Sequence, residues 1–272
     1  MSIKQKALGL ALCIWALPTT PYAQDKTPQT YHSPKQKLHV YLLIGQSNMA
    51  GRAPFTEDES KPIERCFLLD NSGQWEPASN PLNRYSTIRK DLSKQKMNPG
   101  YSFAQTMLEI DKNIDLGLVV NARGGSEIEQ WAEGSKFYQE ALRRVSEAQK
   151  TGTLKGILWH QGEANVEDPD KYIDKLTEIV TQFRKDLAMP ELPFIAGQID
   201  GVPSINEQTA MLPDRLPFTG FVSSEGLTIF EEWHFDAASV KLMGKRYAEE
   251  MLKIHSKLKT EWKNKLHSGG IQ

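Results

Sequence analysis

The sequence predicts an α/β fold of three layers (α/β/α), in which helices cover both faces of a central parallel sheet. Strand-like and helix-like stretches alternate along the chain, which is the pattern of strand–helix–strand units. The clearest strand is a continuous apolar run, as expected of a strand that is buried. The length of 272 residues suits one large α/β domain or two small ones and is ample for a hydrophobic core.

The individual elements follow from local patterns. The first strand, at 38–44, reads LHVYLLI and is rich in β-branched and apolar residues. The helix at 169–187 carries apolar residues with a period of about 3.6 residues, typical of one buried helix face. The other predicted strands are 116–121, 154–159, 193–199 and 219–223, and the other predicted helices are 101–111, 136–150 and 236–258.

A long stretch between the first strand and the first helix lacks a regular pattern. Residues 53–100 contain five prolines and no clear helical or strand period. A long irregular insertion in a compact domain is usually functional or mobile. Because this one directly follows the turn at Ser47, we expect it to wall a substrate site.

Both ends of the chain are predicted to lie outside the domain at 37–258. Residues 1–23 have two early lysines and a short apolar run, followed by small and turn residues, and are predicted to be a cleaved signal peptide. An uncleaved anchor is the alternative, but the apolar run is short for a membrane span. Residues 24–36 are predicted to be a polar linker and 259–272 a polar tail. The mature protein is therefore expected to be secreted or periplasmic.

Charge and cysteine content narrow the possible partners. The formal net charge of -1 gives no basic surface for nucleic acid, so no nucleic-acid partner is expected. Beyond the N-terminal segment, no apolar stretch is long enough to span a bilayer, so no stable membrane association is expected. Cys13 follows the bulky Leu12, where a lipoprotein signal needs a small residue, so lipid attachment is disfavoured. Cys66 would then be alone in the mature chain. It lies in the apolar stretch CFLL and is predicted to be a buried, inert thiol.

Polar residues that chemistry could use gather in four loops. They follow the first strand (GQSNMAG, 45–51), the strand at 116–121 (NARGGS, 121–126) and the strand at 154–159 (HQGEAN, 160–165), and precede the last helix (EEWHFD, 231–236). A parallel sheet brings such loops to one edge. The serine in the first loop stands where a buried strand breaks into a glycine-flanked turn, which can hold a nucleophile at the end of a sheet. The alternative is a serine that only caps a helix.

A serine nucleophile needs a base within hydrogen-bond reach and an acid to orient the base. Of the six histidines, only His160 and His234 lie at the predicted edge. His234 is favoured because Glu231, Glu232 and Asp236 are its sequence neighbours, whereas His160 has no carboxylate closer than three residues. The alternative for His234 is a residue at the start of a helix that bonds a backbone carbonyl.

Donors for an oxyanion are also present. The pair Gly124-Gly125 lets the backbone approach closely and can aim an N–H inward, although a tight turn would use the same residues. The side-chain amide of Gln161 can donate, although ordinary loop hydrogen bonds would also explain it. The backbone N–H of Ser47, at the start of a helix, is a third candidate.

Other chemistries lack their motifs. The G-x-S-x-G elbow, the phosphate-binding P-loop and the G-x-G-x-x-G loop are all missing from the sequence. His160 and Glu163 form only H-x-x-E, so no metal site and no cofactor are expected. Glu231 and Glu232 are adjacent, and adjacent residues rarely flank a glycosidic bond from opposite sides.

Four blocks of the chain together resemble the SGNH-hydrolase superfamily. Residues 44–49 (IGQSNM) resemble its first block in the Gly-Gln-Ser-Asn variant, and residues 124–131 resemble the second block. Residues 159–163 (WHQGE) resemble the third block, and residues 231–235 (EEWHF) the last, usually D-x-x-H. The variant is typical of carbohydrate acetylesterases, namely the sialate O-acetylesterase-like group and the acetylxylan esterases of carbohydrate esterase family six. The resemblance covers about residues 38–250.

The resemblance implies a flavodoxin-like fold and a metal-free serine esterase. Ser47 would be the nucleophile, His234 the base and Glu231 the acid that orients it, although Glu232 or another acid could serve. The oxyanion donors would be the backbone N–H groups of Ser47 and Gly125 and the Gln161 amide.

The implied partner is an O-acetylated carbohydrate, with sialic acid and acetylated xylan-type glycans both open. Candidate substrate-binding residues are Gln46, Asn48, Arg52, Trp131, Glu163 and Trp233. The tryptophans suit a sugar face and Arg52 suits a carboxylated sugar, with core packing and a surface ion pair as the respective alternatives. An esterase acting on non-carbohydrate esters, or a carbohydrate-binding protein without activity, would share much of this pattern.

Overall fold

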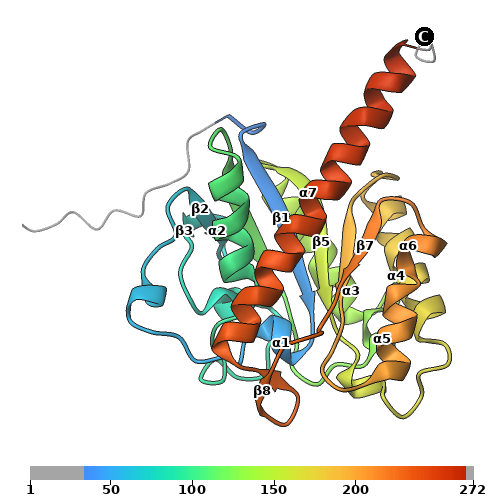
Figure 1. Cartoon of the computed structure of the whole chain (residues 1–272). Helices are drawn as coiled ribbons and strands as arrows, with labels where there is room; N and C mark the ends of the chain where they lie inside the picture. Colours follow the sequence, from blue (N-terminus) through green and yellow to red (C-terminus); the bar gives the residue numbers. More distant parts are fainter. Residues whose placement is uncertain (1–33, 268–272) are drawn as a thin grey trace, which may run out of the picture.

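The computed structural model describes residues 34–267, and the predicted signal peptide lies outside this range together with most of the predicted linker. A seven-stranded sheet forms the middle layer, in the order β3-β2-β4-β1-β5-β6-β7 (Figure 1). All neighbouring strands pair in parallel except β3, which is antiparallel to β2. The strands are β1 (Leu38–Gly45), β2 (Cys66–Leu69), β3 (Trp75–Pro77), β4 (Asp115–Val120), β5 (Thr153–His160), β6 (Phe194–Gly197) and β7 (Thr219–Val222).

Helices cover both faces of this sheet, which confirms the predicted α/β fold of three layers. On one face lie α2 (Gly100–Ile110) and α7 (Ala237–His267). On the other lie α3 (Lys136–Ala148), α4 (Tyr172–Asp186), α5 (Pro203–Ala210) and α6 (Leu212–Arg215). The shorter elements are α1 (Ser47–Ala50), β8 (Ile229–Glu231), β9 (His234–Phe235) and the 3-10 turns η1 (Asp58–Ser60), η2 (Leu82–Tyr85), η3 (Ile128–Trp131) and η4 (Glu163–Asn165).

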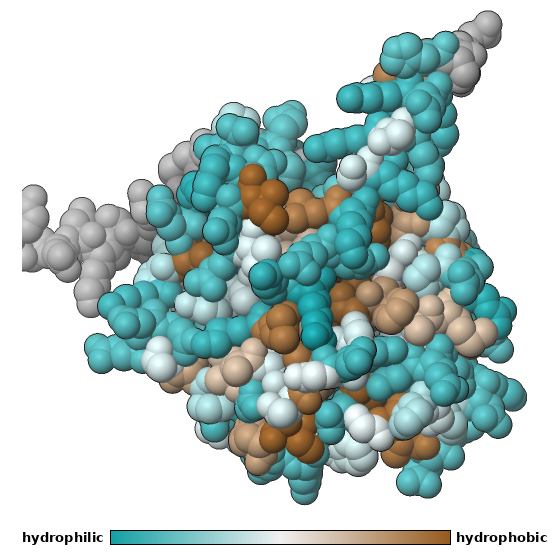
Figure 2. Space-filling model, in the orientation of Figure 1, coloured by the Kyte–Doolittle hydropathy of each residue, from teal (hydrophilic) through white to brown (hydrophobic). Residues whose placement is uncertain are grey.

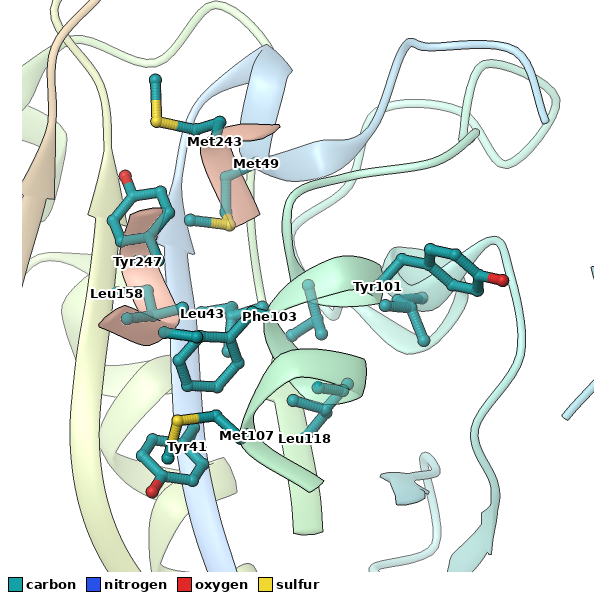
Figure 3. Packing of buried hydrophobic residues seen from close by; sticks show 14 of the residues in the cluster. Tyr41, Leu43, Met49, Tyr101, Phe103, Met107, Leu118, Leu158, Met243 and Tyr247 are labelled. Atoms are coloured by element: carbon teal, nitrogen blue, oxygen red, sulfur yellow. The ribbon is translucent and has the colours of Figure 1, made fainter. Parts of the chain in front are cut away.

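The side chains of β1 alternate between two hydrophobic cores. Tyr41 and Leu43 join the core beneath α2 and α7, whereas Leu42 and Ile44 join the core beneath α3 and α4. Figure 3 shows side chains of β1, α2 and α7 packed together in the first of these cores. Each buried leucine or isoleucine of β1 contributes about 1.5–3 kcal/mol relative to exposure. Burial on both faces explains why β1 reads as a continuous apolar run.

The insertion supplies one edge of the sheet, which the sequence pattern does not predict. The strands β2 and β3 form an antiparallel pair, and β2 adds in parallel to β4. Between these short strands and α2, most of the chain is irregular, as predicted. Cys66 opens β2 and is buried, and burial raises the pKa of its thiol, which fits the inert role predicted for it.

The last helix is longer than predicted. It runs to His267, so the predicted division at 258 between domain and tail falls inside a continuous helix. Figure 1 shows its last turns projecting away from the sheet. Within residues 34–267, no helix combines the length and the apolarity needed to cross a bilayer.

The parallel strands bring their carboxyl ends to one edge of the sheet. In the register of β1 and β5, Gly45 lies beside His160, so the loops that follow these two strands leave the sheet together. The loop after β4 leaves at the same edge, since Asn121 N–H donates to Leu43 O and Arg123 N–H to Gly45 O. Figure 1 places α1 and β8 at this end of the molecule.

Candidate active site

A break in β1 that requires glycine holds Ser47 at the end of the sheet. Gly45 has a φ of 130°, and a Cβ placed there would lie 2.1 Å from the carbonyl oxygen of His160. Gln46 donates its N–H to the same carbonyl at 2.8 Å, and α1 begins at the next residue. The N-cap of α1 is Gln46 rather than Ser47, so the alternative in which Ser47 merely caps a helix is wrong.

Ser47 faces a cavity of about 650 Å³ at the carboxyl edge of the sheet. All four loops predicted to converge contribute to its wall, and Arg52 and the insertion contribute the rest. The predicted site residues that line it are Gln46, Ser47, Arg52, Gly125, Glu163, Glu231, Trp233 and His234. Asn48, Trp131 and Gln161 do not line it.

His234 reaches the cavity from β9 of a short hairpin. Its side chain is 17% exposed, and its Nδ1 lies 4.0 Å from Glu231 Oε2 without a hydrogen bond. Burial lowers the pKa of His234, the Arg52 guanidinium lowers it further, and the nearby carboxylates oppose the shift. No hydrogen bond joins His234 to Ser47 among the described residues; such catalytic bonds often tighten only when substrate binds.

The acid beside His234 is a weak partner. The Glu231 side chain is 64% exposed, so solvent screens its charge. Glu232 also lines the cavity and has a φ of 41°, which is uncommon for a residue with a side chain. Asp236 instead caps the start of α7, because its Oδ1 accepts the backbone N–H of Ser239 at 2.8 Å.

The glycine pair after β4 lies directly against Ser47. A Cβ on Gly124 would lie 2.5 Å from Arg52 Nη2 and 3.9 Å from Ser47 Cβ, so the loop approaches as closely as glycine allows. Gly125 has a φ of 64°. No hydrogen bond within residues 34–267 uses the backbone N–H of Ser47 or of Gly125, so both groups remain available to an oxyanion.

The third predicted oxyanion donor does not fit this geometry. Gln161 is fully buried, and its Nε2 donates to Gln46 Oε1, Ser126 O and Asn165 Oδ1 at 3.1, 3.0 and 2.6 Å. These acceptors engage the amide, and Gln161 does not line the cavity. Gln161 therefore supports Gln46, which does line the cavity, and does not itself face a substrate.

The two tryptophans predicted to bind substrate differ in burial and in their position relative to the cavity. Trp131 is fully buried, stacks edge-to-face on Trp159 and Phe137, and donates its Nε1–H to Ser126 Oγ at 3.0 Å. Its predicted contact with substrate is wrong, because these partners hold it in the core. Trp233 is 40% exposed and lines the cavity, so its predicted place at the site is compatible with the structure.

Arg52 and the insertion form a cationic wall. Arg52 is half-buried, and its Nη1 donates to Gly51 O at 2.8 Å and to Lys94 O at 3.1 Å. Lys90, Lys94 and Lys96 line the same cavity from exposed positions. We call Arg52 and these three lysines the cationic wall. The same cavity is also lined by acidic side chains, namely Asp91, Glu163, Glu231 and Glu232. The lysines were not predicted as site residues, because only the folded insertion brings them there.

His160 lies in the core and does not line the cavity. It is fully buried, its Nδ1 lies 3.1 Å from the Tyr247 hydroxyl, and burial lowers its pKa to about 4. Of the two candidate bases, only His234 shares a cavity with Ser47. Within residues 34–267, no group of three or more His, Cys, Asp or Glu side chains is placed to hold a metal ion.

Known proteins share this sequence pattern. Residues 37–253 match the family model described as "Carbohydrate esterase, sialic acid-specific acetylesterase". A protein of Arabidopsis thaliana named as a probable carbohydrate esterase is 32% identical over an alignment of 185 residues, with a coverage of 60% of this chain and 69% of the relative.

Solved structures share the fold. The structure of that Arabidopsis protein aligns with a TM-score of 0.72 at 26% identity, over 81% of this chain and 99% of the other. The crystal structure of NanS aligns with a TM-score of 0.67 at 18% identity, over 84% and 100% of the two chains. A carbohydrate acetylesterase from Xanthomonas citri aligns with a TM-score of 0.57 at 20% identity, over 78% and 55%. At such identities the last two show the fold alone.

Proposed function

The chain belongs to the carbohydrate esterase family of sialic acid-specific acetylesterases, and from that premise we propose that it removes O-acetyl groups from an acidic sugar of the sialic acid type. The observation that carries the proposal is one cavity in which Ser47, His234 and the Gly124–Gly125 loop meet beside the cationic wall. A nucleophile, a base and oxyanion donors are the parts that acyl transfer needs.

In the proposed mechanism, Ser47 Oγ attacks the acetyl carbonyl carbon while His234 Nε2 takes the hydroxyl proton. The N–H groups of Ser47 and Gly125 hold the oxyanion of the tetrahedral intermediate. His234 then gives the proton to the departing sugar oxygen, which leaves an acetyl group on Ser47. Water attacks this acetyl-enzyme with His234 again as base, and acetate is released. Glu231 faces Nδ1 and favours the tautomer that leaves Nε2 free to accept.

In the part of the chain that the structure describes, four basic and four acidic side chains line the cavity, so the preference for an acidic sugar rests on Arg52 and not on the net charge of the lining. A guanidinium is suited to a carboxylate, because its two N–H groups match the two oxygens. Arg52 lies against the loop that carries the oxyanion donors, so a carboxylate bound there would sit close to the reacting ester. The exposed side chain of Trp233 would pack on the sugar ring.

The substrate assignment predicts a selective effect of Arg52→Gln. We expect KM for O-acetylated sialic acid to rise roughly tenfold or more, as loss of a charged hydrogen bond implies. KM for p-nitrophenyl acetate, which has no carboxylate, should change little. The measurement is acetate or nitrophenol release at pH 8, where His234 is neutral in both proteins. Arg89→Gln is the control, an arginine of the insertion that does not line the cavity.

Two results would contradict this assignment. Equal losses on both esters in Arg52→Gln would assign the arginine to the chemistry rather than to the carboxylate. Faster acetate release from acetylated xylan than from O-acetylated sialic acid by the unmodified protein would favour a neutral glycan.

The pKa of His234 predicts the pH below which the rate of ester hydrolysis falls. The base must be neutral to accept a proton, so kcat/KM should fall as pH drops through its folded pKa. Because burial and Arg52 lower this pKa, the midpoint should lie below 6.5, the ordinary value for histidine. In Arg52→Gln the midpoint should move up. A pH–rate profile from 4 to 9 on p-nitrophenyl acetate tests both; a midpoint above 6.5 in the unmodified protein would contradict the assignment of His234.

A further inference from the structure

Asn48, the residue after Ser47, makes hydrogen bonds to the backbone of the residues on both sides of His234. Its Nδ2 donates to Trp233 O at 2.9 Å, and its Oδ1 accepts the N–H of Phe235 at 3.2 Å. Asn48 is only 1% exposed, so water does not compete for these groups. The short helix that carries Ser47 is thereby tied directly to the strand that carries His234.

Glu163 fixes the orientation of the Asn48 amide. Asn48 Nδ2 gives its second hydrogen bond to Glu163 Oε1 at 2.7 Å. With two acceptors facing Nδ2 and one donor facing Oδ1, a flipped amide would lose all three bonds. Glu163 belongs to η4, directly after β5, so the third loop of the cavity supports the fourth.

The hairpin that carries His234 depends on outside support. Its strands β8 and β9 have only three and two residues, and a two-stranded hairpin is at best marginally stable alone. All three residues of β8 are exposed, and Figure 2 shows hydrophobic surface gathered at this end of the molecule. The nearest acid, Glu231, is 4.0 Å from His234 Nδ1 and mostly in solvent. Fixed geometry at His234 must therefore come mainly from the backbone.

We propose that Asn48 and Glu163 are positioning residues that hold the His234 hairpin over Ser47, with Glu163 acting through Asn48. The kinetic part of this inference rests on the proposed esterase function. The structural part does not, because it concerns how residues 229–235 are held.

The carboxyl of Glu163 makes the inference testable by a conservative change. Burial raises its pKa to about 7, and its Oε2 is buried without a hydrogen bond. An amide has the shape of the protonated carboxyl and keeps an acceptor oxygen for Asn48. Glu163→Gln should therefore keep the Asn48 amide in place. Glu163→Ala should release it, together with the hydrogen bonds by which Asn48 holds the His234 strand, which we call the clamp.

The kinetic test compares Asn48→Ala, Glu163→Ala and Glu163→Gln on p-nitrophenyl acetate. A misplaced base should lower kcat on the order of tenfold to a hundredfold in the two alanine variants, with KM nearly unchanged. Glu163→Gln should recover most of that loss. Asn206→Ala is the matched control, because Asn206 clamps the backbone of Ile199 by the same two kinds of bond, far from His234 in the sequence.

Hydrogen–deuterium exchange supplies a readout that needs no activity. Asn48→Ala and Glu163→Ala should raise exchange in peptides covering 229–235, where the Phe235 N–H loses its acceptor or its order. Glu163→Gln and Asn206→Ala should leave these peptides protected, and Asn206→Ala should raise exchange near Ile199 instead. Thermal melting shows which variants remain folded.

The outcomes separate the two proposals. Unchanged exchange at 229–235 in both alanine variants, or a wild-type kcat in Asn48→Ala, would overturn the positioning role. An unmodified protein that releases no acetate from any ester, while its alanine variants still loosen 229–235, would refute the esterase and leave the clamp established. A kcat that falls equally in Glu163→Ala and Glu163→Gln would show that Glu163 acts by its charge and not by orienting Asn48.

Discussion

Replacement of Ser47 by alanine should abolish turnover and leave the fold intact. If Ser47 forms the acetyl-enzyme, its loss should reduce kcat on the order of 10⁵- to 10⁶-fold, as expected when one member of a cooperating catalytic set is removed. The fold should persist because no hydrogen bond of the described structure uses Ser47 Oγ, and alanine is a strong helix former at the start of α1. Acetate release and thermal melting measure the two effects.

The control for Ser47→Ala is a serine that the cavity does not include. Ser102 of α2 is buried and donates its hydroxyl to Lys241 O at 2.7 Å, so Ser102→Ala should cost stability and leave kcat alone. An organophosphonate that traps serine nucleophiles should label the unmodified protein and Ser102→Ala, but not Ser47→Ala. Labelling of Ser47→Ala, or retention of more than about 1% of wild-type kcat, would place the nucleophile elsewhere.

The fold was predictable where the pattern is local. In β1 burial follows the continuous apolar run, and in α4 it follows the period of about 3.6 residues, because the side chains that reach the core are set by the geometry of a single strand or helix. The β2–β3 pair was missed because its strands are short, and membership of the sheet depends on pairing with β4 across some fifty residues of chain. The predicted end of α7 is too early because lysines and other polar residues dominate the stretch after Ile254, although Leu258, Trp262 and Leu266 recur there every four residues.

The residue types at the site could be predicted better than the directions in which their side chains point. Ser47 and His234 follow from the chemistry that acyl transfer needs and from the edge at which parallel strands end. The direction of the Gln161 amide depends on one acceptor in its own loop and on acceptors from two other loops, and no spacing in the sequence encodes it. The lysines of the cationic wall could not be found either, since the irregular insertion has no periodicity from which their position follows.

Replacement of His234 by alanine should also cost most of the activity, on the order of 10⁴-fold or more in kcat. His160 cannot replace it because it is sealed in the core, and Glu231 is a poor substitute because its side chain is 64% exposed to solvent. The fold should persist, since His234 Nδ1 has no hydrogen bond to lose. Glu231→Gln should cost only roughly tenfold, because a solvent-screened partner at 4.0 Å stabilises the imidazolium weakly.

Chemical rescue distinguishes a missing base from a damaged site. The cavity left in His234→Ala opens to solvent, so added imidazole should restore part of the turnover, with a pH dependence that follows the free imidazole and no longer the protein. Imidazole should not rescue Ser47→Ala, which lacks the nucleophile. His39→Gln is the control, because His39 lies at the opposite end of β1. If His160→Gln stayed folded and lost turnover as completely as His234→Ala, the base would have to be reassigned. The burial of His160 and its bond to Tyr247 predict a loss of stability instead.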